Sequence, residues 1–285
     1  MTIYEFSVIT SDGFPYHQLK IAQPPNGVKL SLRFYDFSKS EIETADNLNA
    51  KESFELNAGL VSALFKFAKG INKKINALEF YNYNGLSDTK KLPDLQGNVL
   101  ITAQTESFLL DKSVYEKIKL IYQLILRYKI PLDSALEMLN SEEKKIKQIL
   151  SDQVAKSLVA KNKSKIKRIT NGYFDEMEVY GLNGICIASF DLSPILVFGK
   201  KYSLDDITTI LRNIGNIPEI SPLEWKYRQS SLGDEQIWVY IYKSDVGPTV
   251  EGLFEPYFYL LFSDPQSYLG ELPGLLGVKL NQILG

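Results

Sequence analysis

The chain has 285 residues, and at about 150 residues per domain this length predicts two domains, each able to bury its own core. A composition of 45% apolar and 23% charged residues is typical of globular proteins and excludes a largely disordered or collagen-like chain. The 32 basic residues nearly cancel the 34 acidic ones, which argues against a protein that binds nucleic acid through a basic surface. One cysteine, Cys186, and one histidine, His17, exclude an intrachain disulfide and a His/Cys zinc site.

The first half of the chain predicts an antiparallel sheet followed by helices. Tyr4, Phe6 and Val8 alternate with polar residues, and the turn Ser11-Asp12-Gly13 then leads into a second apolar run, a pattern typical of a β-hairpin. We interpret residues 23–53 as an insertion, because much of this stretch is polar and irregular. The remaining predicted elements are strands at 28–37, 77–83 and 98–104, an amphipathic helix at 58–71, and a helix from a Ser113–Glu116 capping box to about Tyr128, before Pro131.

Charge is distributed unevenly along the chain. Residues 144–168 contain nine basic residues and one acid, a net +8, whereas residues 169–285 contain fifteen acids and seven bases, a net −8. Apolar residues recur every four positions through the basic stretch, at Ile146, Leu150, Val154 and Leu158, which predicts one long amphipathic helix. We therefore expect a first domain at residues 1–165, closed by this basic helix, and a second domain at residues 171–285.

The second half repeats much of the predicted order of the first. An Asp-x-x-Pro turn joins two apolar runs at Asp12–Pro15 and again, 179 residues later, at Asp191–Pro194. After the second hairpin, Ser203 and Asp206 form a capping box at the start of a helix. The predicted elements that follow are strands at 223–229, 236–243 and 256–262 and a short C-terminal helix that contains Leu275, Leu276, Leu280, Ile283 and Leu284.

A β-hairpin, one helix, a three-stranded meander and C-terminal helices make the order of the longin and roadblock families, which are profilin-like modules. The first half resembles archaeal members in Ser7-Val8-Ile9-Thr10-Ser11-Asp12-Gly13-Phe14-Pro15-Tyr16 and in Ala58-Gly59-Leu60-Val61-Ser62-Ala63-Leu64-Phe65-Lys66-Phe67-Ala68. The expected fold class is α/β (α+β), with two longin/roadblock-like modules, each a five-stranded antiparallel sheet with flanking helices. The resemblance implies a non-catalytic adaptor or scaffold without a cofactor, which pairs with a like module or a second copy and regulates a Ras-like small GTPase.

The sequence contains none of the catalytic motifs that we tested. It has no Gly-x4-Gly-Lys-Ser/Thr phosphate loop and no Gly-x-Ser-x-Gly nucleophile turn, so we expect no enzymatic activity, no catalytic residues and no bound metal. Neighbouring carboxylates at Asp175-Glu176, Asp205-Asp206 and Asp234-Glu235 are better explained as solvated or helix-capping residues. The alternative is a module that binds a small ligand, or an enzyme whose site has no sequence motif.

Two surfaces are candidates for partner binding. Apolar residues fill an arc of roughly 200° around the helix at 58–71, more than one sheet face covers, so its edge at Val61 and Phe65, with Lys66 and Lys69 beside it, is expected to contact a partner. The intramolecular alternative is that the insertion or the second module covers this edge. The other surface lies in the basic stretch, where five residues are candidates for contact with an anionic membrane, or else a solvated helix face opposite the acidic half: Lys161, Lys163, Lys165, Lys167 and Arg168.

The aromatic residues Trp238, Tyr240 and Tyr242 alternate along one strand face, a pattern that also occurs in sheets that stack RNA bases. The −8 charge of this half opposes a phosphate backbone, so we expect these rings to pack in a core and expect no nucleic-acid partner. The N-terminal residues lack the basic and apolar regions of a secretory signal, which predicts a cytoplasmic protein, peripheral to a membrane where the basic helix contacts one.

Overall fold

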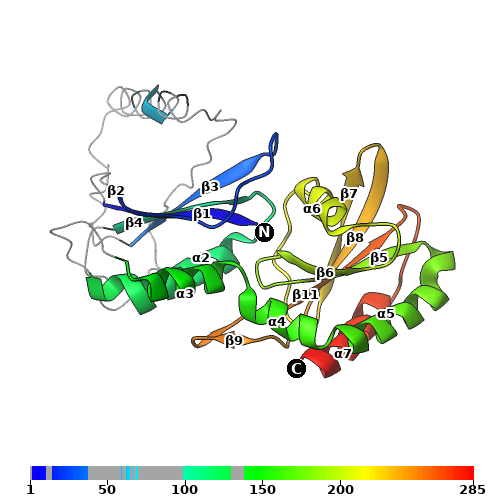
Figure 1. Ribbon diagram of the computed structural model, residues 1–285. Helices are drawn as coiled ribbons and strands as arrows, with labels where there is room; N and C mark the ends of the chain where they lie inside the picture. Colours follow the sequence, from blue (N-terminus) through cyan, green and yellow to red (C-terminus); the bar gives the residue numbers. More distant parts are fainter. Residues whose placement is uncertain are drawn as a thin grey trace, which may run out of the picture. The chain divides into compact units, whose positions relative to one another are not determined.

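The computed structural model describes residues 2–10, 15–37, 99–129 and 138–285, together with the helical positions 59, 62–64, 66 and 69 (Figure 1). Residues 1–38 and 96–285 form one compact unit, and residues 39–95 form another. The fold is mixed α/β with antiparallel sheets, as the sequence predicts. Two five-stranded sheets are not found: the described residues form sheets of four, five and two strands, and the strand predicted at 77–83 lies outside them.

The four-stranded sheet has the strand order β2-β1-β4-β3. The hairpin and both later strands are confirmed where they are described, although the hairpin turn at residues 11–14 is outside the described residues. β3 falls inside the stretch that we interpret as an insertion, and it pairs with β4 along its full length. The four strands are β1 (Ile3–Thr10), β2 (Pro15–Lys20), β3 (Leu30–Asp36) and β4 (Val99–Glu106).

Helix α2 (Asp111–Ile121) packs beside this sheet through aromatic contacts. The rings of Phe37 and Tyr122 stack with centroids 4.5 Å apart, and Tyr35 lies 5.9 Å from Tyr115. The predicted capping box at Ser113 and Glu116 is wrong, because the helix already begins at Asp111 and Ser113 is buried within it. The helix continues as a π-helical turn (Tyr122–Leu126) and a 3₁₀ turn (Arg127–Lys129).

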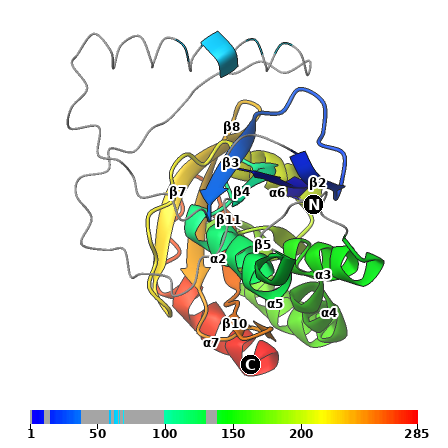
Figure 2. The same ribbon diagram turned by 90° about the vertical axis from the view of Figure 1, so that its left-hand side faces the viewer.

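The basic stretch is three helices rather than the single helix that its periodicity predicts. Asp152 adopts a left-handed conformation with φ of 55°. This residue separates the helix that ends at Leu150 from the helix that begins at Gln153, and the second helix runs in a different direction (Figure 2). The break changes which residues face the core, so Val154 is 41% exposed whereas Ala155 and Val159 are buried. The helices are α3 (Asn140–Leu150), α4 (Gln153–Lys161) and α5 (Lys163–Met177), followed by a 3₁₀ turn (Glu178–Tyr180).

The five-stranded sheet has the strand order β6-β5-β11-β8-β7, with every neighbouring pair antiparallel. The hairpin at 182–198, the capped helix and the three-stranded meander predicted from the sequence are all confirmed, with shifts of a few residues at their ends. A two-stranded hairpin, β9 (Thr249–Val250) and β10 (Leu253–Phe254), interrupts the meander. The five strands are β5 (Leu182–Ala188), β6 (Pro194–Phe198), β7 (Trp225–Leu232), β8 (Glu235–Lys243) and β11 (Phe258–Ser263).

Helices cover both faces of the five-stranded sheet (Figure 1). On one face lie α4, α5 and the C-terminal helix α7 (Leu272–Leu284), which buries Leu272, Leu276, Leu280 and Leu284 at four-residue spacing. Burial of a leucine contributes about 1.5–3 kcal/mol, so this stripe is enough to dock α7. Tyr240 and Tyr242 are buried in the same core, as expected for packing, and Trp238 packs against it but is only half-buried.

Helix α6 (Leu204–Arg212) covers the opposite face. Its predicted capping box is confirmed: the Asp206 backbone N–H donates to Ser203 Oγ across 3.2 Å, and the Ser203 N–H donates to the Asp206 carboxylate across 2.8 Å. The domain boundary that we expect at residues 165–171 falls inside α5, a continuous helix. The two-domain division stays a prediction.

Candidate interaction site

The basic side chains of the sequence analysis lie on α4 and α5 and are exposed. Ile166 and Thr170 turn inward to the core, which leaves the charged residues between them in water. The exposed residues are Lys161, Lys163, Lys165, Lys167 and Arg168.

Two of these residues line a groove and three do not. Lys163 and Lys167, one helical turn apart, line a groove of about 810 Å³ that runs between α5 and the edge strand β6. Lys161, Lys165 and Arg168 do not line it. The structure therefore divides the predicted basic surface into a groove pair and an outer group.

The groove has an apolar wall and charged ends. Leu196 and Phe198 of β6 and Phe174 of α5 contribute apolar side chains to its lining, and Lys200 lies just beyond the end of β6. Lys163, Lys167 and Lys200 form no ion pair with any described residue. Asp175 and Glu178 line the groove at the other end of α5 from Lys163. The arrangement favours an elongated ligand that is apolar along its length and acidic toward one end.

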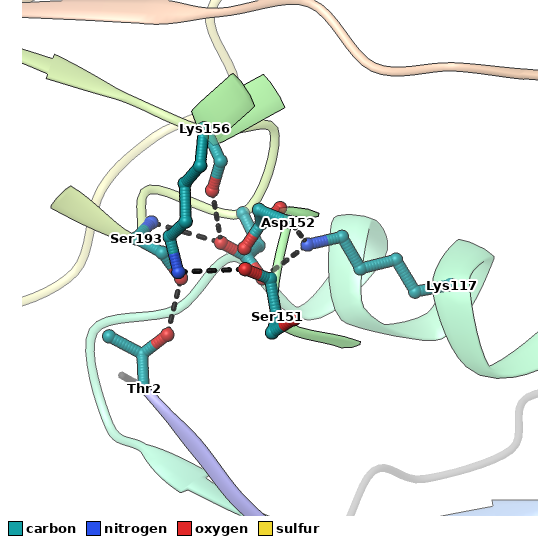
Figure 3. A network of polar contacts seen from close by, with 8 residues as sticks. Thr2, Lys117, Ser151, Asp152, Lys156 and Ser193 are labelled. Carbon is teal, nitrogen blue, oxygen red and sulfur yellow. Dashed lines mark hydrogen bonds and ion pairs between the residues drawn. The ribbon is translucent and has the colours of Figure 1, made fainter. Parts of the chain in front are cut away.

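A buried charge network joins α2, the α3–α4 break and the β5–β6 turn (Figure 3). Lys117 is completely buried, and its Nζ donates to Asp152 Oδ1 across 2.5 Å and to Asp191 Oδ2 across 2.7 Å. The second oxygen of Asp191 accepts from Ser189 Oγ and from the Ser193 backbone N–H, which holds the turn before Pro194. The predicted Asp-x-x-Pro turn therefore anchors a lysine from the first half of the chain.

The network contains more acid than base. Glu255 is also buried, its Oε1 has no hydrogen-bond partner among the described residues, and burial raises its pKa from 4.5 to about 7. Burial and the charge of Asp191 raise the pKa of Asp152 to about 6, despite the attraction of Lys117. Burial alone would raise the pKa of Asp191, but Lys117 and the serine hydrogen bonds hold it near 2.

Burial opposes the charge of Lys117, yet its three acidic neighbours raise its pKa above the ordinary value. The lysine is therefore charged at neutral pH and serves as the counter-ion of the network, not as a base or a nucleophile. The lysine is completely enclosed, which favours a structural role for the cluster over a catalytic one.

A further buried carboxylate, outside this network, connects the two halves of the chain. Glu106, at the end of β4, accepts from Arg212 Nε across 3.0 Å and from Arg212 Nη2 across 2.6 Å. The Tyr4 hydroxyl donates to the same carboxylate across 2.5 Å. The planar guanidinium satisfies both oxygens at once, so α6 is fixed to the first sheet. Thr2 also lies in hydrogen-bond contact with Ser193 (Figure 3).

The other predicted partner surface is only partly described. Val61 and Phe65 lie outside the described residues, whereas Lys66 and Lys69 are exposed on a helix. Partner binding by these four residues stays a prediction.

His17 and Cys186 both lie within strands. His17 is a half-buried residue of β2 that lies 3.4 Å from Glu143, and Cys186 is completely buried in β5. Burial raises the pKa of the Cys186 thiol to about 12, which makes it unreactive at neutral pH. Across the described residues, no group of three or more His, Cys, Asp or Glu side chains is placed to hold a metal ion.

Sequence analysis missed the buried charges. Lys117 stands between Val114 and Ile118 on the apolar face of its helix, and a charge at such a position is a detectable sign of a buried partner. Asp152 is the one acid in the basic stretch, which is a second sign. The partners themselves have no sequence signature, since they lie 35 and 74 residues from Lys117.

No helix in the described part of the chain is both long and apolar enough to cross a membrane. No protein-family model matches this chain, and no curated protein is significantly similar to it.

Proposed function

We propose that the protein is a non-catalytic adaptor or scaffold, built from two longin/roadblock-like modules, that pairs with like modules and acts on a Ras-like GTPase. The observation that carries the proposal is the element order of the second half. β5 and β6 form a hairpin, α6 follows, β7, β8 and β11 form a meander, and α7 ends the chain. This is the order on which the resemblance rests.

The pairing of the strands supports a repeat. In the first sheet β1 lies between its hairpin partner β2 and the last strand β4. In the second sheet β5 lies in the same way between β6 and β11. Both sheets therefore place the hairpin beside the strand that is last in the chain, as expected for two copies of one module.

The use of the buried charges supports a non-catalytic role. Lys117 forms ion pairs with Asp152 and Asp191 inside the protein, and Glu106 is bound by Arg212. A catalytic group has to reach substrate, and these groups are enclosed or committed to internal bonds.

The proposal is tested with the purified chain and Ras-like GTPases from its own source. We expect the chain alone neither to bind nor to hydrolyse GTP, and to change the nucleotide-release or hydrolysis rate of a GTPase that it captures. Light scattering would show whether the chain forms a dimer. Capture of no GTPase, with rates unchanged for every candidate added at excess, would refute the regulatory role.

The groove favours a second candidate function. Its volume of about 810 Å³ lies within the range of small-ligand sites, roughly 300–1,000 Å³. Metabolites can be screened by thermal shift. Small-ligand binding would be favoured if one metabolite raised the melting temperature saturably and a substitution in the groove lining abolished that rise.

Contact with an anionic membrane is proposed for the outer basic group, Lys161, Lys165 and Arg168. These side chains are exposed and do not line the groove. Each lysine near an anionic surface contributes about 1 kcal/mol, so three residues give only weak, salt-sensitive binding. Sedimentation with phosphatidylserine vesicles should show binding that Lys161→Glu/Lys165→Glu abolishes.

A further inference from the structure

We propose that the groove between α5 and β6 binds an acidic segment of a partner protein, which pairs with β6 as a sixth strand of the second sheet. The inference rests on the proposed adaptor function and names the kind of partner segment. Three independent features support it: a strand edge, an apolar wall and a pair of lysines.

The first feature is the edge of the sheet. Within the described residues β6 pairs with β5 alone, so alternate backbone N–H and C=O groups of β6 point away from the sheet. Exposed sheet edges normally carry charged residues that oppose further pairing. In the four- and five-stranded sheets each of the other edge strands does: β2 has Lys20, β3 has Arg33 and Asp36, and β7 has Lys226 and Arg228.

β6 differs from these three edges. Its sequence, Pro194-Ile195-Leu196-Val197-Phe198, contains no charged residue, and Ile195, Leu196 and Val197 are only half-buried. An uncharged edge with backbone groups unpaired is the kind that accepts an added strand from another chain.

The second feature is the wall of the groove. Leu196 and Phe198 lie opposite Ile187 and Ile185 in the register, so both point to the face that α5 covers. Together with Phe174 they line the groove next to the free edge. Side chains of an added strand alternate between the two faces, so every second one would contact this wall.

The third feature is charge. Lys163 and Lys167 project from the N-terminal turns of α5 without an ion-pair partner in the described chain, whereas the acids of the groove lining, Asp175 and Glu178, lie toward the other end of the helix. Acidic side chains near these lysines would gain attraction, and a basic segment would be repelled. This selects an acidic segment rather than a second copy of the uncharged β6.

A peptide with blocked termini and a fluorescent label, four valines followed by four glutamates, is a direct probe, because it places both valine and glutamate side chains on the face that α5 covers. We expect saturable binding to the purified chain by fluorescence polarisation, weakened as salt is raised. Lys163→Glu/Lys167→Glu should weaken binding by about tenfold or more, because both charges then repel the peptide. The matched control is Lys161→Glu/Lys165→Glu, which changes the net charge equally on the outer side of the same helices and should have little effect.

Strand pairing is tested with two methylated peptides. In an extended strand the amides of alternate residues face opposite edges, so N-methylation of the odd-numbered amides blocks one edge and N-methylation of the even-numbered amides blocks the other. One of these peptides should lose binding and the other should keep it. Thermal melts of both double variants would show that each remains folded.

Several results would overturn the inference. These are no binding of the parent peptide, equal binding of both methylated peptides, or equal weakening by the groove and control variants. Displacement of the peptide by inorganic phosphate, or by phosphatidylserine vesicles, would place a simple anion or a membrane in the groove instead. The peptide assay contains no GTPase, so an inactive chain in the GTPase assay that still binds peptide would refute the proposed function and leave the groove intact.

Discussion

Lys117 Nζ and Asp191 Oδ2 lie 2.7 Å apart although the residues are 74 positions apart in the chain, and both side chains are completely buried. The lysine comes from the helix that packs on the first sheet, and the aspartate from the hairpin turn of the second. The ion pair therefore makes the structure of the β5–β6 turn in the second sheet depend on α2, the helix that packs on the first sheet.

Lys117→Met is expected to lower the free energy of unfolding by about 3–5 kcal/mol, because Asp152 and Asp191 would remain buried without a counter-ion. Urea denaturation measures the loss. Lys112→Met is the control on the same helix: its ion pair with Glu219 is exposed, so the change should be within about 1 kcal/mol. Equal effects of the two substitutions would contradict the assigned role of Lys117.

The buried acid should make stability fall as pH rises from about 4.5 to 7. Over that range the unfolded chain releases the proton of Glu255, whereas the folded chain, with a pKa of about 7, keeps it. Asp152, with a raised pKa of about 6, acts in the same direction. Asp191 loses its stabilising effect only in more acidic solution, and Lys117 only in strongly alkaline solution.

Glu255→Gln should therefore stabilise the protein at pH 8, by up to about 3 kcal/mol at 1.4 kcal/mol per pKa unit, and change little at pH 4.5. Tyr257, whose pKa burial raises, remains neutral throughout this range. Chemical denaturation at both pH values measures the effect. A variant with the same pH dependence as the original chain would show that Glu255 is not the titrating group.

Arg212 and Glu106 should show a strong energetic coupling. Removing the guanidinium leaves a fully buried carboxylate whose one remaining side-chain partner among the described residues is the Tyr4 hydroxyl. We expect Arg212→Met and Glu106→Gln to be less than additive, with a coupling of about 1–3 kcal/mol. A double-mutant cycle measured by urea denaturation gives this value, and additive single effects would argue against the contact.

The docking of α7 depends on a glycine. A Cβ at Gly277 would lie 2.4–2.9 Å from ring atoms of Tyr242, which is itself fixed in the core. Gly277→Ala should therefore destabilise the protein by about 1–3 kcal/mol through overpacking. Gly274, in the same helix, has no atom of a described residue within 4 Å of its Cβ position, and Gly274→Ala should be neutral or slightly stabilising. Thermal melts compare the two.

Phe65→Asp tests the partner surface predicted from the sequence. If Phe65 lies at an edge of the helix that a partner covers, the substitution should weaken self-association or partner binding more than it lowers the melting temperature. Light scattering and thermal melts of the same preparation decide between the two effects. A large loss of melting temperature at unchanged mass would show that Phe65 belongs to the core.

Much of the second sheet could be predicted because each element has a local signal. Ser203 and Asp206 form a capping box within four residues, and Asp191–Pro194 form a turn within four. The apolar alternation of β8 likewise marks a strand whatever its partner is.

The break at Asp152 could not be predicted in the same way. The spacing of Ile146, Leu150 and Val154 is ideal for one helix, and only the distant Lys117 gives Asp152 a reason to be buried and left-handed. A local pattern therefore predicted the wrong core face, because a contact across 35 residues overrides it. The groove was missed for a related reason, since it needs α5 and β6 side by side.

The shared ionic junction affects how the chain can be dissected. A cut at residue 165 leaves Lys117 and Asp152 on one fragment, and Asp191 and Glu255 on the other. In the first fragment Lys117 would lack Asp191. In the second fragment the β5–β6 turn would be exposed, and Asp191 would lack Lys117. We expect each fragment expressed alone to be less stable than the full chain. Mixing the two fragments should restore stability, because Lys117 and Asp191 can then form their ion pair again.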